Sequence, residues 1–190
     1  MSAATQPIRN KKHLQRLAGY FLKRKEYRNH LLLVIGSHTA LRISDILSLT
    51  WKDVYNEEKA EFCTHISLTE RKTGKTKLVA LHPRVIAALR LYLPHRRGDA
   101  LFASTHNCLV AISRVQAWRI LSGAAAAIEL GIRVSAHALR KTFGYHCWRE
   151  GVPVTVLMEI YNHSSYEVTR RYLGVTQDDL DRAYLAVGLF

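Results

Sequence analysis

Apolar residues recur at helical spacing along most of the chain, and this periodicity predicts a mainly helical fold. Residues 11–25 place their apolar side chains on one helix face, with Asn10 in position to cap the first turn. Residues 28–41 are apolar on most sides, a pattern typical of a helix buried in the core. Further helices are expected over 43–49, 83–92, 113–129, 137–150 and 153–160, then over EVTRRYL after a Ser164 or Ser165 cap, and over the segment that follows Thr176.

The helical pattern is interrupted once, in the first half of the chain. EFCTHISLTE (61–70) and TKLVAL (76–81) are rich in strand-forming residues, and Gly74 lies in the short KTGK segment between them. Two such runs joined by a short glycine-containing turn predict an antiparallel hairpin. The expected fold class is therefore mainly α with one small antiparallel β-sheet.

Composition places the chain among globular proteins with an anionic partner. Its 190 residues are enough for one well-buried domain, and no linker or internal repeat divides them. We therefore expect residues 1–9 to be a flexible leader and residues 10–190 to form a single domain. The net charge of +13 points to a polyanion, with nucleic acid the first candidate and anionic membranes or acidic proteins as alternatives.

Cysteine usage and hydropathy indicate a location inside the cell. Cys63, Cys108 and Cys147 are odd in number and far apart, so a disulfide framework is not expected. No run of 18 apolar residues could span a membrane, and the N-terminal residues lack the apolar core of a signal peptide. We expect a cytoplasmic protein without a membrane partner.

Side chains that can bind or attack a phosphate stand where predicted helices begin or turn. In chain order they are Arg42, Lys72, His137, Arg140, His163 and Tyr172. His137 and Arg140 are three residues apart, so they share a helix face. Each side chain alone also has an ordinary structural interpretation. Tyr172 could be a packed aromatic residue, and Arg42 could form a salt bridge with Asp45.

Four stretches that carry these residues occur in a characteristic order. They are TALRISDILSLTWKDV, KTGKTKLVAL, HALRKTFGYHCWREG and NHSSYEVTRRYLGV. Together they resemble the catalytic domain of the tyrosine recombinases, the phage-integrase family of site-specific DNA recombinases. The stretches are similar to that family's first arginine motif, its lysine hairpin, its H-x-x-R box, and its second histidine with the tyrosine nucleophile. The resemblance runs from about residue 10 to the C-terminus and implies the DNA breaking-rejoining fold.

The resemblance also implies a reaction. Tyr172 would attack a DNA phosphate, which leaves a 3′-phosphotyrosyl bond and a free 5′-hydroxyl. Because a phenol has a pKa near ~10, it needs a base, and His137 is the candidate. Arg42 and Arg140 would each donate two hydrogen bonds to the phosphoryl oxygens, and His163 would donate one more.

The remaining groups have supporting roles in this interpretation. Lys72 is expected to protonate the leaving 5′-oxygen, with Lys75 as the alternative. Asp45 is expected to orient Arg42 or His137 from behind. Candidate DNA contacts are Lys75, Lys141, Arg170 and Arg171.

Partners and cofactors follow from the same resemblance. The expected partner is double-stranded DNA, bound by a homo-oligomer that is a tetramer on DNA, with a monomer in solution as the alternative. No cofactor is expected, because the phosphotyrosine keeps the energy of the broken bond. No metal site is expected either, since neither C-x-x-C nor H-E-x-x-H occurs.

Three features depart from the family's usual pattern. Tyr161 and Asn162 stand where Leu-Gly is usual, and Asp45 replaces a common glutamate. Asn tolerates the left-handed backbone that a glycine would supply, so the turn before His163 is expected to persist. About ten residues precede the first predicted helix, so we expect no separate core-binding domain and a grip on DNA from one side only.

Two other functions remain open on the sequence. A recombinase relative that only occupies DNA could regulate excision or transcription, and a topoisomerase IB-like enzyme uses a related set of arginine, lysine and tyrosine. The C-terminal tail 176–190 is amphipathic, with Thr176 and Asp179 at capping-box spacing. It could dock on its own domain or be exchanged between protomers.

Overall fold

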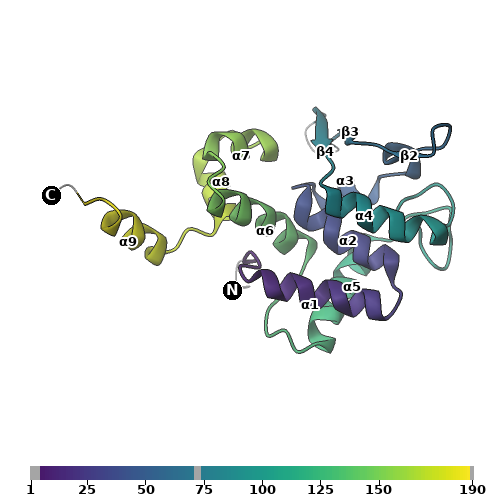
Figure 1. Cartoon of the computed structure of the whole chain (residues 1–190), viewed down its shortest axis with the longest axis horizontal. Helices are drawn as coiled ribbons and strands as arrows, with labels where there is room; N and C mark the ends of the chain where they lie inside the picture. The colour runs from purple at the N-terminus through teal and green to yellow at the C-terminus, as the bar shows by residue number, and fades with distance from the viewer. Residues whose placement is uncertain (1–4, 71–73, 189–190) are drawn as a thin grey trace.

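The computed structural model describes residues 5–70 and 74–188 and shows a mainly helical protein (Figure 1). Its α-helices are α1 (Lys11–Lys23), α2 (Tyr27–His38), α3 (Ile43–Leu47), α4 (Pro83–Tyr92), α5 (Arg114–Ala127), α6 (Ala136–Arg149), α7 (Val154–Tyr161), α8 (Tyr166–Leu173) and α9 (Gln177–Leu185). The 3-10 helices are η1 (Trp51–Asp53) and η2 (Leu93–His95). Asn10 accepts a hydrogen bond from the backbone N–H of Lys12 at 2.9 Å, which confirms it as the N-cap of α1.

The strands form two short antiparallel ribbons, not the single one expected. β3 (His65–Thr69) pairs with β4 (Thr76–Ala80), with Ile66 opposite Val79, and this is the predicted hairpin. A second ribbon joins β1 (Tyr55–Asn56) to β2 (Glu61–Phe62). Its strands are two residues long, too short for a period-2 pattern to stand out in the sequence.

Helix α2 lies at the centre of the main hydrophobic core. Its residues from His30 to Gly36 are all buried, as the uniformly apolar sequence predicts. Helices α1, α4, α5 and α6 pack against it, so its apolar surface is covered on several sides. This core fixes the position of the chain at the C-terminal end of α2, where Arg42 begins α3.

A second, smaller core lies beneath α7 and α8. Its fully buried members include Leu157, Tyr161 and Leu173, and Tyr172 packs at its edge. Tyr161 fits because Gly144 of α6 has no side chain: a Cβ there would lie 2.3 Å from the tyrosine hydroxyl. The hydroxyl donates to the carbonyl of Arg140 at 2.7 Å. The two helices are thereby held against the start of α6.

The structure corrects the expectation of a flexible leader for residues 5–9. Ile8 is 2% exposed, and its N–H donates to Thr142 Oγ1 at 2.8 Å. Arg9 donates to the carbonyl of Gly174 at 3.0 Å, immediately beyond α8. One apolar residue among polar neighbours carries no periodic signal, so its burial was not visible in the sequence. The leader's first four residues lie outside the described part of the chain.

Helix α9 stands apart from the rest of the molecule (Figure 1). The capping box of Thr176 and Asp179 is present, but none of the residues described in α9 is buried. Tyr184 and Leu185 are 81% and 86% exposed. Its ionic contact with the body joins Asp179 to Arg149 at 3.0 Å. Within the described ranges, no helix has the length and apolar character needed to cross a membrane.

Candidate active site

Arg140 lies at the centre of the candidate site. It belongs to the first half of α6, is 3% exposed, and donates to the backbone carbonyls of Ala40 and Tyr161. Its guanidinium lies 4.8 Å from the ring centre of Tyr161 and 5.7 Å from that of Tyr172. Burial lowers the pKa of Arg140, and the charge of Arg42 lowers it further. Its Nε finds no hydrogen-bond partner among the described residues.

Arg42 approaches the same place from the start of α3. It occupies the N-cap position of that helix in an extended conformation, directly after the buried Leu41. Its Nη1 lies 2.8 Å from Oε2 of Glu70, and its side chain is 21% exposed. Two arginines from distant segments therefore converge on one point, which is the arrangement that an anionic ligand requires.

His163 lies on the turn between α7 and α8. Asn162 adopts the left-handed conformation there, with φ 55°, as expected for a residue replacing glycine. The imidazole is stacked on Tyr161, with ring centres 5.1 Å apart, and its Nδ1 is 3.0 Å from Thr169 Oγ1. Burial, followed by the charges of Arg140 and Arg42, lowers the pKa of His163 to about 4. The ring is therefore neutral near pH 7.

Tyr172 projects from α8 toward these groups. Its ring centre is 4.8 Å from that of His163 and 5.4 Å from that of His137. Its ring is half-buried at the edge of the smaller core. The Nζ of Lys141 lies 5.7 Å from the ring centre, so cations flank the tyrosine on two sides.

His137 lies one turn before Arg140 on α6 and faces solvent. Partial burial lowers its pKa, and the charges of Lys141 and Arg140 lower it further. A neutral imidazole beside a tyrosine ring is able to accept a proton. The structure thus brings together five of the six predicted groups, while Lys72 lies outside the described residues.

The comparisons with known proteins agree with this geometry. The family model described as "Phage integrase family" matches residues 10–178. The chain belongs to the phage integrase family. Within that family it is 37% identical over 183 residues to the probable integrase/recombinase YoeC of Bacillus subtilis, covering 96% of this chain and 97% of that protein.

The Xer recombinases are more distant relatives in the same family. Tyrosine recombinase XerD of Mycobacterium leprae is 31% identical over 159 residues, which cover 78% of this chain and 48% of that protein. XerA of Pyrococcus furiosus is 27% identical over 165 residues, which cover 85% and 55%. This phage-integrase-family chain therefore spans about half the length of those two relatives. Family membership supports site-specific recombination as its class of activity.

Solved structures show the same fold. A crystal structure of XerA recombinase has a TM-score of 0.78 at 20% identity, with 98% of this chain and 65% of that one covered. A lambda integrase(75–356) dimer bound to a COC′ core site has a TM-score of 0.70 at 16% identity, with 100% and 65% covered. At these identities the likeness concerns the arrangement of helices and strands.

Two charged residues of this integrase-family site, one buried and one partly buried, were missed in the sequence. Glu70, at the end of β3, has no exposed side-chain surface and contacts both Arg42 and Lys77. Lys77 lies on β4, and its Nζ is 3.0 Å from Glu70 Oε1 and also donates to the carbonyl of Ile160. A signal existed: an acid stands beside a basic turn in TERKTGK. The alternation of residues along a hairpin, by contrast, does not indicate that this acid is buried.

The groups predicted to contact DNA do not share one environment. Arg170 and Arg171 are exposed on α8, as expected of surface contacts. Lys141 is buried instead, and its Nζ donates to the carbonyl of Thr5 at 2.8 Å. Lys75 is exposed but donates to Asn162 Oδ1 at 3.0 Å. Asp45 is buried in α3 next to Ser44, and the ion pair of Arg42 described above is made with Glu70.

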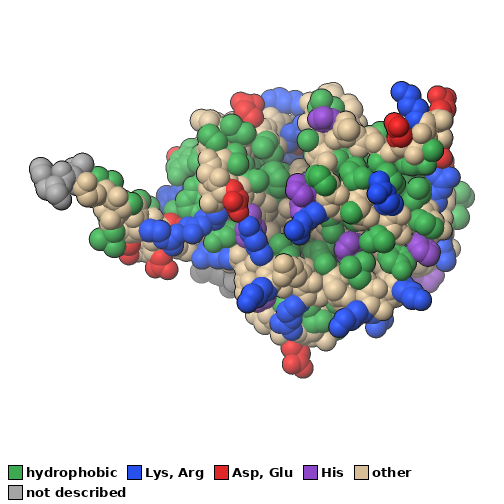
Figure 2. All heavy atoms as spheres, in the orientation of Figure 1, with side chains coloured by type: hydrophobic (Ala, Val, Ile, Leu, Met, Phe, Trp, Pro, Cys, Tyr) green, Lys and Arg blue, Asp and Glu red, His purple; other side chains and the backbone are tan. Residues whose placement is uncertain are grey.

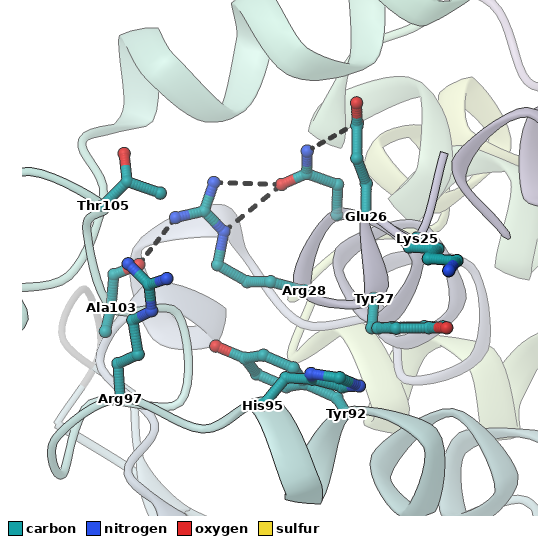
Figure 3. A pocket seen from close by; sticks show the side chains of 10 residues that line it. Lys25, Glu26, Tyr27, Arg28, Tyr92, His95, Arg97, Ala103 and Thr105 are labelled. Atoms are coloured by element: carbon teal, nitrogen blue, oxygen red, sulfur yellow. Dashed lines mark hydrogen bonds between the residues drawn. The ribbon is translucent and has the colours of Figure 1, made fainter. Parts of the chain in front are cut away.

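Two hollows lie outside the catalytic cluster. An apolar groove of about 710 Å³ runs between α1, α2, α4 and α6, with Leu14, Leu33 and Phe143 in its lining. Hydrophobic and histidine side chains gather on the face that Figure 2 shows. A cavity of about 300 Å³ lies at the other end of α2, around Arg28 (Figure 3). Across the described ranges, no three histidine, cysteine or acidic side chains are placed to hold a metal ion together.

Proposed function

We propose that this chain cleaves and rejoins double-stranded DNA at a specific site through a 3′-phosphotyrosyl intermediate, with Tyr172 as the nucleophile. The observation that carries the proposal is the position of the Tyr172 ring, 5.7 Å from the guanidinium of Arg140 and 4.8 Å from His163. Nine tyrosines occur in the chain. Tyr172 belongs to α8, whose sequence matched the nucleophile motif, and it faces the converging cations.

In this mechanism the Tyr172 oxygen forms a bond to phosphorus while the bond to the 5′-oxygen breaks. The phenolic proton passes to His137, whose lowered pKa keeps it neutral and able to accept. Arg42 and Arg140 stabilise the charge that develops on the phosphoryl oxygens. His163, neutral at pH 7, donates one further hydrogen bond to them.

Lys72 supplies the proton that the leaving 5′-oxygen takes up, as the general acid on the β3–β4 hairpin. Attack by a second 5′-hydroxyl on the phosphotyrosine reverses these steps and joins a new strand. The bond energy stays in the intermediate throughout, so the reaction consumes no cofactor. Asp45 is buried in α3, a few residues after Arg42, and helps to hold this part of the site.

The homo-oligomer on DNA is assembled, in this proposal, through α9. The apolar residues of α9 are exposed, and the lambda integrase neighbour is a DNA-bound dimer. We place α9 of one copy in the apolar groove between α1, α2, α4 and α6 of the next. Arg84 at that groove complements Asp178 and Asp181 of α9, while Lys11 is paired there with Glu150. Deletion of residues 177–190 should then prevent assembly on DNA while a single copy still binds.

The test of the nucleophile uses covalent capture. The protein is incubated with nicked duplexes, both a randomised library and fragments of DNA flanking the encoding gene, and SDS-resistant adducts are isolated and sequenced. Tyr172→Phe should bind the recovered site within about twofold of wild type, because phosphate contacts dominate affinity. It should form no adduct. Tyr166→Phe is the matched control, since Tyr166 is exposed on the same helix, and it should form adducts like wild type.

An adduct formed by Tyr172→Phe would contradict the assignment of the nucleophile. Absence of any adduct with the wild-type protein, together with site-specific DNA binding, would instead indicate a regulator that only occupies DNA. Adducts at unrelated sequences, with relaxation of supercoiled plasmid, would indicate a topoisomerase.

A further inference from the structure

Glu70 is a buried carboxylate that joins the β3–β4 hairpin to the active site. It is 1% exposed at the end of β3. Its two oxygens lie 2.8 Å from Arg42 and 3.0 Å from Lys77. An isolated buried carboxylate is costly, so these cations determine where Glu70 can lie. Because Arg42 comes from α3 and Lys77 from β4, the carboxylate ties two separate elements together.

Asn162 adds a third element to this junction. It precedes His163 and ends α7 in the left-handed conformation. Its Oδ1 accepts a hydrogen bond from Lys75 Nζ at 3.0 Å, and its Nδ2 donates to Glu70 Oε2 at 3.4 Å. A glycine would supply the same backbone conformation but neither of these contacts. The asparagine side chain therefore does something that the turn itself does not need.

Further hydrogen bonds join the described residues on either side of the hairpin turn. The backbone N–H of Glu70 donates to the carbonyl of Lys75, and that of Gly74 donates to the carbonyl of Glu70, each at 2.9 Å. On the neighbouring strand, Lys77 donates to the carbonyl of Ile160 at the end of α7. Both sides of the turn that contains Lys72 are thus attached to the α7–α8 segment.

We propose that Glu70 and Asn162 are positioning residues that hold the β3–β4 hairpin against the His163 turn, so that Arg42 and His163 meet one phosphate. We call the contacts among Glu70, Asn162 and Lys75 the hairpin bridge. The proposal rests on the function proposed above. Such contacts are needed because a two-stranded hairpin is marginally stable by itself. A catalytic group on its turn loses efficiency when it is misplaced by even about 1 Å.

The main test is Asn162→Gly, because glycine keeps the left-handed turn and removes only the side chain. At saturating DNA we expect adduct formation to slow by about three- to tenfold, the size of one or two lost hydrogen bonds. The Kd for DNA should stay within about twofold. Amide hydrogen exchange of the hairpin, residues 65–80, should become faster without DNA, while the thermal midpoint is not lowered.

A second pair of variants separates the bridge from general loss of charge. Glu70→Gln should slow adduct formation at least as much as Asn162→Gly, since it leaves Arg42 and Lys77 without their carboxylate. Glu26→Gln is the matched control. Glu26 also contacts an arginine and an asparagine, Arg24 at 2.7 Å and Asn29 at 3.0 Å, but at the opposite end of α2 (Figure 3). It should cleave at the wild-type rate.

Several outcomes would overturn the bridge. One is a wild-type cleavage rate in Asn162→Gly, which would leave the asparagine with a backbone role alone. Another is a loss of rate that follows a lowered thermal midpoint or weakened DNA binding. If wild-type protein forms no adduct with any DNA, the proposed function fails, and hydrogen exchange decides the bridge by itself: unchanged exchange of residues 65–80 in Asn162→Gly overturns it.

Discussion

Arg28 is partly buried and Arg140 is almost completely buried, and the surroundings of these two arginines differ. Arg28 lies near the N-terminal end of α2, in the cavity of about 300 Å³, and Arg140 lies near the start of α6. Burial lowers the pKa of both. A guanidinium has five N–H donors, so the two sites can be compared by the acceptors that each arginine finds.

At Arg28 each of the three guanidinium nitrogens donates to an acceptor in the protein. Nη1 donates to the carbonyl of Ala103 at 2.6 Å, and Nε and Nη2 donate to Asn29 Oδ1 at 3.2 and 3.1 Å (Figure 3). The stacked rings of Tyr27 and His95, with centres 4.7 Å apart, line the same cavity. This arginine joins α2 to the loop at Ala103 and keeps little capacity for a ligand.

At Arg140 the protein receives only part of the donors. The carbonyls of Ala40 and Tyr161 accept two hydrogen bonds, and Nε has no hydrogen-bond partner among the described residues. The ring centre of Tyr172 lies 5.7 Å from the guanidinium of Arg140. The positive charge of Arg42 lowers the pKa of Arg140 further. Arg140 is thus a buried cation beside a second cation, and one of its three nitrogens makes no hydrogen bond to a described residue. The contrast supports the phosphate-binding role proposed for Arg140 and gives Arg28 a structural role.

The largest expected effect is that of a substitution at Arg140, the arginine proposed to bind phosphate. Arg140→Lys keeps the charge but loses the forked donors, and we expect adduct formation to fall by about 10²–10³-fold, as for loss of a transition-state donor. Single-turnover kinetics with the captured site measures it. DNA affinity should change far less, because many phosphate contacts remain.

Arg28→Lys is the paired variant. It should cleave at the wild-type rate and lose about 1–3 kcal/mol of unfolding free energy, because acceptors at Ala103 and Asn29 lose their donors. Urea unfolding gives that number. Equal losses of cleavage in the two variants would show that the arginines do not differ in role.

A smaller effect is expected where the scaffold beneath Arg140 is disturbed. Gly144→Ala would place a Cβ 2.3 Å from the hydroxyl of Tyr161, whose ring supports the guanidinium. Overpacking of this kind costs about 1–3 kcal/mol of unfolding free energy, and displacement of Tyr161 should also slow cleavage. Gly123→Ala in α5 is the control, since no atom lies within 4 Å of its added Cβ. It should be neutral or stabilising by up to about 1 kcal/mol. Comparable destabilisation of both would count against the close contact.

The helices and the predicted reacting groups could be found from the sequence because each follows a characteristic spacing of residues. The burial of α2 followed from its apolar run, and the sites of Arg42, His137, Arg140, His163 and Tyr172 followed from motif spacing. The structure brings these five side chains together. Their catalytic roles remain predictions, as does that of Lys72.

What the sequence did not reveal depends on contacts between distant segments. No sequence pattern singles out Glu70, yet in the structure it is buried between Arg42 and Lys77. Ile8 looked like part of a loose leader, yet it completes the core beside Thr142. Neither has a periodic neighbour, and each owes its burial to partners that are distant in sequence and close only after folding. For the same reason the sequence does not reveal that Lys141, a predicted DNA contact, is buried.

The smallest expected effect concerns pH and His163, a titratable neighbour of Arg140. Its pKa in the folded protein is about 4, against about 6.5 in an unfolded chain. The unfolded chain therefore binds more protons between these values, so this contribution to stability is complete above pH 6.5 and is lost as the pH falls toward 4. Because the ring is only partly buried, solvent screening reduces the effect to on the order of 1 kcal/mol between pH 7.5 and 5. Urea midpoints measured at both pH values should fall less in His163→Gln than in wild type. His106→Gln, on an exposed loop, should follow wild type. If all three proteins lose stability equally, burial and the charges of Arg140 and Arg42 do not lower the pKa of His163, and the convergence of cations that distinguishes this site from that of Arg28 is weaker than the geometry indicates.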